Sequence, residues 1–415
     1  MLKDTFISIF LKGIGVCSSF LISVYLGREL GLEDFGRFEF INNLSVFILV
    51  LFSFGMPHII TREVAIAKAG NQLERISNIF LSTQYFCLGI SVLLSLILVL
   101  CSPFISSIFF SDSSIEVPLA LFVISVVLQS LTKNISAALN GFNKVWQGNL
   151  FDQVIGVFLI CIGIILFCSW SVSVIELLDI AIIFLGCRIV VFIVSLAYWK
   201  HVFEYRFPYK NILKKLKQSI SRLFLLSITA NITLVISPFI IGFFCGAEEI
   251  GLFSIAQKLA FTTVLLLQIV SSVLAPKIAE MYNQGKRHEL KGLIGRTSGL
   301  LLVTGASILG MFVLYGKVLV GFWGEEFLSA YPLLIILAIG QFVNMATGVV
   351  GITLIMTGHD RIITNISVIF VVLSVGLNLI LVSEFGVQGA AYAIALVLIV
   401  ENLFKFLMVK KLKIV

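Results

Sequence analysis

Apolar runs long enough to cross a membrane recur along the whole 415-residue chain, and they limit its fold more than any other feature. The apolar fraction is 59% and the charged fraction is 12%, whereas about a quarter of the residues in an ordinary soluble domain are charged. Soluble folding would leave this excess of apolar surface in contact with water. About 18 apolar residues suffice to cross roughly 30 Å of hydrocarbon. We therefore predict an integral membrane protein.

We predict twelve spans, and each should be an α-helix, because a span in lipid must satisfy its own backbone hydrogen bonds. They cover about residues 5–26, 40–60, 77–101, 117–139, 151–170, 176–198, 222–244, 252–275, 297–320, 331–356, 362–383 and 389–409. The period-2 alternation of an outer-membrane barrel is absent. The first run is too long for the apolar core of a cleaved signal peptide, so we expect it to be retained.

An internal repeat divides the chain into two halves. Residues 31–38 (GLEDFGRF) recur 215 positions later as residues 246–253 (GAEEIGLF), and residues 141–144 (GFNK) recur 217 positions later as residues 358–361 (GHDR). A nearly constant offset of about half the length indicates two structurally equivalent halves. In a membrane, two such halves usually form a transporter with its substrate path at their interface.

The fold predicted from these features is all-α, with two pseudo-symmetric six-helix bundles around a central cavity. Residues 1–200 form the first bundle, residues 201–221 a cytoplasmic linker, and residues 222–415 the second bundle. With a cytoplasmic N-terminus, 21 of the 29 Lys and Arg residues fall on the cytoplasmic side, which is a strong positive-inside bias. We predict that both termini are cytoplasmic. The net charge of +7 then reflects topology rather than nucleic-acid binding.

Motifs for enzymatic chemistry are absent from the sequence. There is no GxxxxGK[ST] phosphate loop, and no Ser–His–Asp or paired-carboxylate arrangement stands out. The seven cysteines lie within spans or at their ends without metal-ligand spacing, and no histidine adjoins the carboxylates of a metal site. We predict no enzyme activity, no cofactor and no metal.

Cations inside spans are the sharpest functional indication. Inserting Lys or Arg at mid-span into the membrane costs roughly 2.5–3.5 kcal/mol, so such a residue usually faces a polar interior. Lys12 belongs to a polar stripe at three- and four-residue steps along the first span. The stripe comprises Thr5, Ser8, Lys12, Gly15, Ser19 and Ser23. It favours a water-filled cavity, and the alternative is that Lys12 reaches the inner interface.

Lys258 lies on a similar stripe of the eighth span, where extension to the outer surface competes equally with a cavity role. Arg188 lies near the middle of the sixth span and should have a partner, as a structural pair or as a functional group. Lys133 lies near the inner end of the fourth span, where extension to the interface is favoured. Glu401 and Lys405 form an i,i+4 pair in the last span, and Glu401 is a candidate proton carrier.

Several segments together resemble the polysaccharide-biosynthesis exporters, the O-antigen flippases of the multidrug/oligosaccharidyl-lipid/polysaccharide (MOP) superfamily. Residues 27–36 (GRELGLEDFG) are similar to the family's segment after its first span. Residues 356–361 (MTGHDR), 377–381 (LNLIL) and 385–393 (FGVQGAAYA) are similar to the family's ending, in which a G-x-x-G-A-A motif opens the final helix. Chain length, span number and the repeat agree across essentially the whole chain.

The resemblance implies a flippase in the bacterial inner membrane that serves lipopolysaccharide biosynthesis. Its substrate would be an undecaprenyl-diphosphate-linked oligosaccharide, most specifically the O-antigen repeat unit, and its partners would be membrane lipids, the glycan polymerase and the chain-length machinery. In such proteins two halves form a V-shaped cavity lined with cations. On this chain that implies Lys12 and Lys258, with Arg28 at the outer mouth.

Other functions remain open at this point. A multidrug exporter of the same superfamily would need acids rather than Lys12 and Lys258 in its cavity, and a flippase could also serve capsule, enterobacterial common antigen or teichuronic-type glycans. The peptidoglycan-precursor flippase usually has two further helices. A membrane-embedded polymerase or acyltransferase would need a large periplasmic loop or a buried catalytic histidine, and the sequence shows neither.

Overall fold

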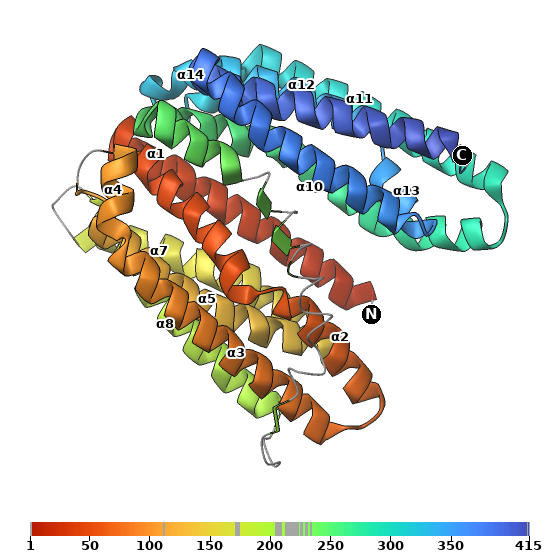
Figure 1. The fold of residues 1–415 in the computed structure, drawn as a ribbon, viewed down its shortest axis with the longest axis horizontal. Coiled ribbons are helices and arrows are strands. Elements are labelled where there is room, and N and C mark those ends of the chain that lie inside the picture. The colour runs from red at the N-terminus through yellow and green to blue at the C-terminus, as the bar shows by residue number, and fades with distance from the viewer. Residues whose placement is uncertain are drawn as a thin grey trace. The chain divides into compact units, whose positions relative to one another are not determined.

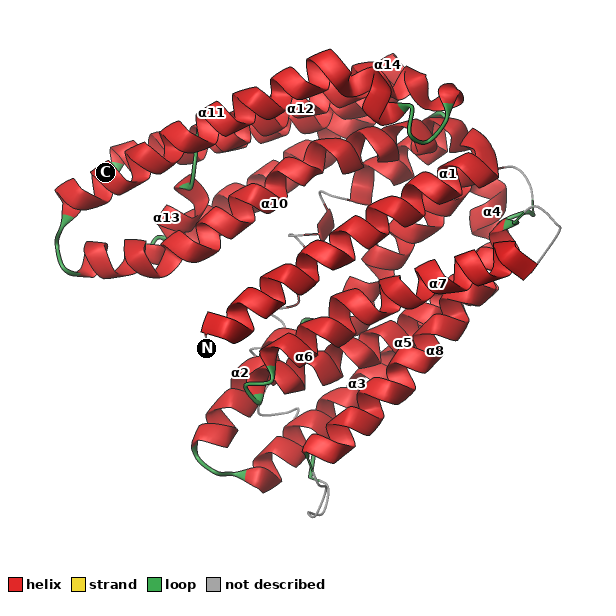
Figure 2. Ribbon diagram, turned by 180° about the vertical axis from the view of Figure 1, so that it is seen from behind, coloured by secondary structure: helices red, strands yellow, loops and turns green. Residues whose placement is uncertain are grey.

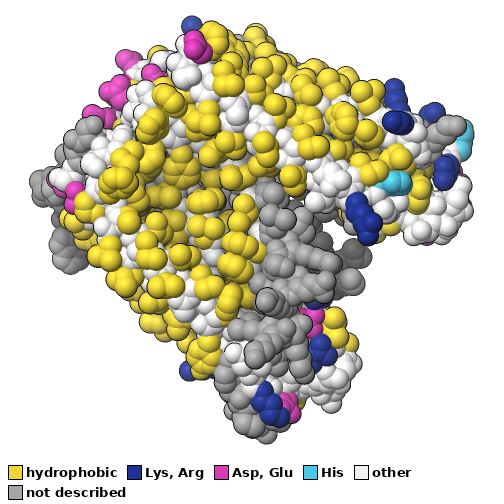
Figure 3. Space-filling view, in the orientation of Figure 1, with side chains coloured by type: hydrophobic (Ala, Val, Ile, Leu, Met, Phe, Trp, Pro, Cys, Tyr) yellow, Lys and Arg dark blue, Asp and Glu magenta, His cyan; other side chains and the backbone are white. Residues whose placement is uncertain are grey.

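The computed structural model describes residues 2–110, 113–170, 175–203, 210–211, 224, 227–228, 231–232, 235–412 and 414. Every regular element in these ranges is a helix (Figure 2). Hydrophobic side chains cover most of the face seen in Figure 3. The all-α prediction and the prediction of a multi-pass membrane protein are therefore confirmed.

The chain divides into two compact units, Met1–Val235 and Ile236–Val415. The predicted linker at 201–221 falls largely outside the described residues. The predicted division into residues 1–200, 201–221 and 222–415 therefore stays a prediction.

The first unit is built around α5, which packs against α1, α2, α3 and α8. Its elements, drawn in Figure 1, are α1 (Leu2–Ser53), α2 (Met56–Ala69), α3 (Leu73–Leu100), α4 (Ser102–Phe110), α5 (Glu116–Gly141), α6 (Val145–Asn149), the π-helix η1 (Leu150–Val154), α7 (Ile155–Trp170) and α8 (Leu177–Val202). An aromatic group fills the end of this core, where Trp199 of α8 contacts Phe80 and stacks on Phe203.

The second unit is built around α12, which packs against α10, α11 and α14. Its elements are the helical segment Val235–Phe244, apart from its first residue, followed by α10 (Ala247–Asn283), α11 (Arg287–Val320), the 3₁₀-helix η2 (Glu325–Ala330), α12 (Tyr331–Ala346), α13 (Val350–Met356) and α14 (Asp360–Lys411). Ser237 donates a buried hydrogen bond of 2.8 Å to Asn378, which ties the first segment to α14.

Two pairs of predicted spans are joined through a single glycine. Gly31 inside α1 has φ 72° and ψ 177°, and Gly386 inside α14 has φ 58° and ψ −143°. These conformations are essentially restricted to glycine. Figure 1 shows that the chain turns back at each position, so α1 and α14 each contain two antiparallel segments.

The G-x-x-G-A-A motif has a direct physical explanation in this turn. Gly386 supplies the backbone conformation. A Cβ on Gly389 would overlap the carbonyl group of Leu381 across the turn. Ala390 and Ala391 are completely buried, so only small side chains fit where the two segments meet.

Nine helices in the described residues are long and apolar enough to cross a membrane. Two of these, Gly13–Ser53 and Arg361–Lys411, contain the glycine turns just described. The number of spans, predicted as twelve, stays a prediction.

The prediction of continuous helices over residues 40–60 and 331–356 is wrong. Phe54 (φ 48°) and Gly55 (φ 70°) separate α1 from α2, and Gly348 (φ 75°) lies between α12 and α13. A Cβ on Gly348 would overlap the hydroxyl group of Ser298 on α11. The Phe54 ring stacks on Phe224 with ring centroids 3.8 Å apart, so its unusual backbone conformation is held by packing.

Candidate functional site

The first segment of α1 carries three of the predicted site residues. The backbone of Lys12 is helical, and its side chain lies outside the described residues. Ser19 is exposed, and Arg28 is exposed in the last turn before the glycine turn at Gly31.

The predicted polar stripe of α1 is packed at some positions and open at others. Gly15 is buried against η1, because a Cβ there would lie 2.9 Å from the carbonyl oxygen of Gln153. Ser23 is also buried, with 2% exposure. Among the three stripe members whose burial the structure describes (Gly15, Ser19 and Ser23), Ser19 is the exposed one. The contact of Gly15 with η1 fixes the position of the helix beside it.

Arg188 lies on α8 and points toward α7. Its Nη1 atom lies 2.7 Å from the position that a Cβ on Gly156 would occupy, so the absence of a side chain on Gly156 makes room for the guanidinium group. Asp152, in η1, is the carboxylate whose charge acts on Arg188. The expected charged partner is therefore near, although the two side chains do not form an ion pair within 4 Å in the described part of the chain.

Lys133 lies half-buried on α5, next to a buried polar contact between helices. Asn134 is fully buried and donates a hydrogen bond of 3.1 Å to Gln84 of α3. Gln84 in turn donates to the carbonyl group of Leu131, 3.3 Å away. The side chains of Asn134 and Gln84 thus form a polar cluster next to Lys133 in the core of the first unit.

In the second unit, Lys258 is half-buried on α10. One turn before it, Ser254 is 2% exposed, and its hydroxyl oxygen has no hydrogen-bond partner in the described residues. In α14, Lys405 and Glu401 form an ion pair of 2.8 Å, with exposed side-chain fractions of 15% and 18%. The predicted i,i+4 pair is confirmed.

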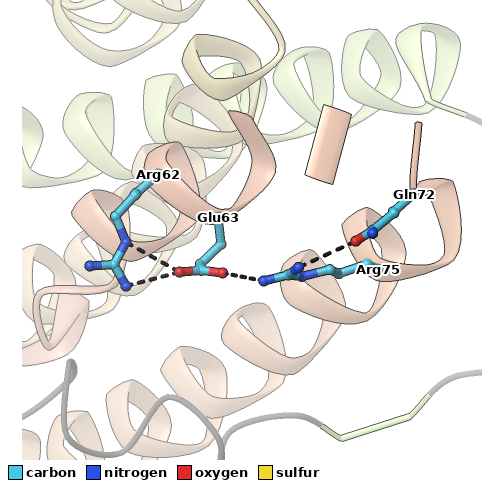
Figure 4. Close-up of polar contacts among 4 residues, drawn as sticks. All are labelled: Arg62, Glu63, Gln72 and Arg75. Carbon is cyan, nitrogen blue, oxygen red and sulfur yellow. Dashed lines mark hydrogen bonds and ion pairs between the residues drawn. The ribbon is translucent and has the colours of Figure 1, made fainter. Parts of the chain in front are cut away.

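A charge network that sequence reasoning missed lies at the α2–α3 turn (Figure 4). The Glu63 carboxylate, 10% exposed, accepts hydrogen bonds from Arg62 at 2.9 Å and from Arg75 at 2.8 Å. Arg75 also donates to Gln72 at 3.2 Å. The opposite charges of Arg62, Glu63 and Arg75 could have suggested such a network from the sequence. Which of these residues form ion pairs, however, depends on how the turn folds.

The predicted site residues are only partly brought together. Lys133 and Arg188 lie on α5 and α8, which pack against each other, and Lys12 and Lys258 belong to different units. The sequence analysis did not predict the π-helix η1 or a role for Asp152 within it. A π-helical turn is of interest here because such turns frequently occur at functional sites. Across the described ranges, no group of three or more His, Cys, Asp or Glu side chains could hold a metal ion.

Comparison with known proteins identifies the family. A family model described as "Polysaccharide biosynthesis protein" matches residues 1–282. The probable low-salt glycan biosynthesis flippase Agl15 of Haloferax volcanii is 30% identical over 159 residues, which are 38% of this chain and 34% of that protein. The chain thus aligns with about a third of that relative's length.

Solved structures agree in fold along nearly the whole chain. An inward-facing multidrug resistance MATE family transporter of the MOP superfamily has a TM-score of 0.76 at 15% identity, covering 98% of this chain and 94% of that one. The lipid II flippase MurJ, in an inward closed conformation, has a TM-score of 0.73 at 18% identity, covering 99% and 88%. At these identities the likeness concerns the fold alone. Its fold is similar to that of these two helical transporters, and because the family model covers more than half of the sequence, this chain belongs to the polysaccharide biosynthesis protein family.

Proposed function

We propose that this protein is a flippase for a lipid-linked oligosaccharide, and most specifically for an undecaprenyl-diphosphate-linked O-antigen repeat unit. It would move this substrate from the cytoplasmic to the periplasmic leaflet of a bacterial inner membrane, with both of its own termini in the cytoplasm. The family membership and the similarity to a glycan biosynthesis flippase support this proposal.

The chemistry of the substrate explains why a protein is needed. Each glycan hydroxyl costs several kcal/mol if it enters hydrocarbon without a partner, and the diphosphate carries full charge. A polar cavity with fixed cations supplies replacement partners for the headgroup, while the polyprenyl chain stays in lipid. Alternating access then exposes the headgroup to one side of the membrane at a time.

The observation that carries the proposal is the balance of charge inside the spans. Lys133 and Arg188 are half-buried, and neither takes part in an ion pair among the described residues. Glu401, by contrast, is neutralised by Lys405. The charge of Asp152 acts on Arg188, so Lys133 is the clearer example of a span cation without a nearby acid in the described part of the chain. Such a cation suits an anionic diphosphate, whereas a cationic drug would require carboxylates at that place.

Lys12 and Lys258 are proposed as the main cations for the headgroup, with Arg28, Arg188, Lys133 and Ser19 as further cavity groups. Replacing Lys12 and Lys258 together by alanine should reduce surface glycan by about tenfold or more, since losing each charge-assisted contact costs on the order of 1.5–3 kcal/mol. The readout is glycan display per molecule of membrane-inserted protein. Lys411→Ala, an exposed cation at the end of α14, is the control and should leave display unchanged. Normal display by the double variant would remove both lysines from the mechanism.

The substrate class is tested by deleting the gene and identifying which lipid-linked saccharide accumulates on the cytoplasmic leaflet. Accumulation of an O-antigen unit supports the specific proposal. A capsule-type or other polyprenyl-linked glycan would retain the flippase function and replace its substrate. No accumulation, together with increased sensitivity to cationic drugs, would favour the multidrug exporter to which the fold is also similar.

Proton coupling through Glu401 is a separate proposal. Protonation of Glu401 would break its ion pair with Lys405, which gives a carboxylate inside a span two alternative states. Glu401→Gln should therefore reduce the dependence of transport on a pH gradient. Full gradient dependence in this variant would exclude Glu401 as the proton carrier.

A further inference from the structure

The turn between α10 and α11 extends well beyond the apolar parts of these helices. α10 has 37 residues and is therefore about 55 Å long, compared with roughly 30 Å of hydrocarbon. Beyond the apolar segments the two helices stay paired through a buried seam of Ile278, Leu290 and Ile294. The end of this hairpin is therefore an ordered structure outside the hydrocarbon layer.

The same turn occurs in the first unit, between α2 and α3. Asn71 (φ 51°) and Gly285 (φ 73°), 214 positions apart, occupy equivalent places. In both turns the amide of this residue bonds to the carbonyl three residues earlier, and the next amide bonds to the carbonyl five residues earlier. Residues of the two hairpins can therefore be compared position by position.

The comparison shows that the charges are exchanged. Glu63 and Arg75, which form an ion pair of 2.8 Å across the first hairpin, correspond to Lys277 and Glu289 in the second. Lys277 and Glu289 are exposed and do not form an ion pair in the described structure. The two hairpins share a backbone and differ in how their charges are used.

The cations of the first hairpin are held by contacts with other groups. Glu63 holds Arg62 and Arg75 (Figure 4). Lys210 forms an ion pair of 2.9 Å with Glu74, and Lys68 donates to the carbonyl oxygen of Phe142 at 2.6 Å. Each cation of the first hairpin thus has a partner within the protein, and the three cations and two acids of residues 62–75 leave one net positive charge.

Four cations of the second hairpin, apart from Arg287, are not in ion pairs with other described residues. Lys277, Lys286, Lys291 and Arg296 are exposed and take part in no ion pair in the described ranges. Of the acids, Glu280 accepts a hydrogen bond of 3.1 Å from Gln284 instead of pairing with a cation. In Figure 3, Lys and Arg side chains gather at the end of the second unit that holds both the α10–α11 turn and the C-terminal end of α14.

We propose that the α10–α11 hairpin docks onto the anionic phospholipid headgroups of the leaflet on its own side of the membrane, and that the α2–α3 hairpin does not. Position identifies the partner. Lys277 and Arg296 directly adjoin the apolar parts of α10 and α11, which places them at headgroup level. A cation at an anionic membrane surface contributes about a fivefold increase in affinity. This docking is independent of the glycan substrate.

The test measures binding of short-chain phosphatidylglycerol to the purified full-length protein in neutral detergent. K277Q/R296Q should weaken binding by about tenfold or more, and binding to the wild type should weaken with salt. The matched variant R62Q/E63Q/R75Q removes the three charges of the Arg62–Glu63–Arg75 network and should change the dissociation constant by less than about twofold. Equal losses in both variants, or no loss in K277Q/R296Q, would overturn the proposal.

Two controls keep the result interpretable. The charge-conserving variant K277R/R296K should bind phosphatidylglycerol like the wild type, and its failure to bind would show that shape rather than charge decides. Inorganic diphosphate should compete weakly. Competition as strong as that of the lipid would show a free-anion site and overturn the assignment to the membrane surface.

Discussion

Glu63 illustrates at the scale of single residues how much a buried charge depends on its partners. Its carboxylate is almost enclosed and is stabilised by two guanidinium groups from opposite sides of a turn. Glu74, at the same turn, forms an ion pair with Lys210 whose two side chains are 46% and 68% exposed. Burial should make the two carboxylates differ in their contribution to stability.

Glu63→Gln should lower the free energy of unfolding by about 1–2 kcal/mol, because two arginines lose a buried counter-charge that solvent only partly replaces. Glu74→Gln should lower it by less than about 0.5 kcal/mol, since exposed pairs contribute little. Thermal unfolding of the protein in detergent measures both. Equal effects would show that burial at this turn does not control the contribution of the pair.

Sequence reasoning at this scale succeeds for local pairs and fails for pairs formed by folding. Glu401 and Lys405 are one helical turn apart, so spacing alone predicted their contact. Arg75 is twelve residues from Glu63, across a turn whose hydrogen bonds the sequence does not specify. The position of the Arg188 side chain next to Gly156 depends on the packing of α7 against α8, so the sequence alone could not predict it either.

The elements of this fold are set by hydropathy, and their ends are set by a few backbone positions. Long apolar runs predicted the helices. The break at Phe54 and Gly55 lies inside such a run, where phenylalanine is itself apolar and a single glycine lowers the mean hydropathy only slightly. The breaks were missed because the pattern that predicts a span carries no information about φ.

Gly31→Ala and Gly386→Ala should each destabilise the protein by about 1–3 kcal/mol, because alanine is strained at these backbone angles. Gly376, also in α14, has open space around it, and a Cβ at this position would meet no other group within 4 Å. Gly376→Ala should be neutral or stabilising by up to about 1 kcal/mol, as expected inside a helix. The melting temperatures of the three variants measure these effects. If Gly31→Ala and Gly386→Ala melt like the wild type, the positive φ angles assigned to the two turns are wrong.

At the scale of the whole molecule, the first unit holds the beginning of the chain segment that leads to the second. Lys210 is fixed through both of its backbone groups. Its amide donates to the buried Asn78 side chain at 2.7 Å, and its carbonyl accepts from the Ser82 hydroxyl at 3.4 Å. A peptide held in this way resists proteases, which need a free, extended backbone.

Asn78→Ala should therefore accelerate tryptic cleavage after Lys210 by several-fold, since loss of a hydrogen bond of about 1 kcal/mol raises the released population roughly fivefold. Glu74→Gln removes the side-chain pair and leaves the backbone contacts, so it should have a smaller effect. Peptide mapping over time separates the two. Identical cleavage rates in wild type and Asn78→Ala would show that this contact does not restrain the segment.

The single-glycine turns also have a practical consequence for experiments on topology. A connection of one residue leaves no slack into which an epitope tag or a reporter domain can be inserted, so fusions placed at Gly31 or Gly386 should prevent membrane insertion rather than report sidedness. Accessibility at those two corners is better probed by single cysteines at neighbouring exposed positions such as Glu33 and Phe385.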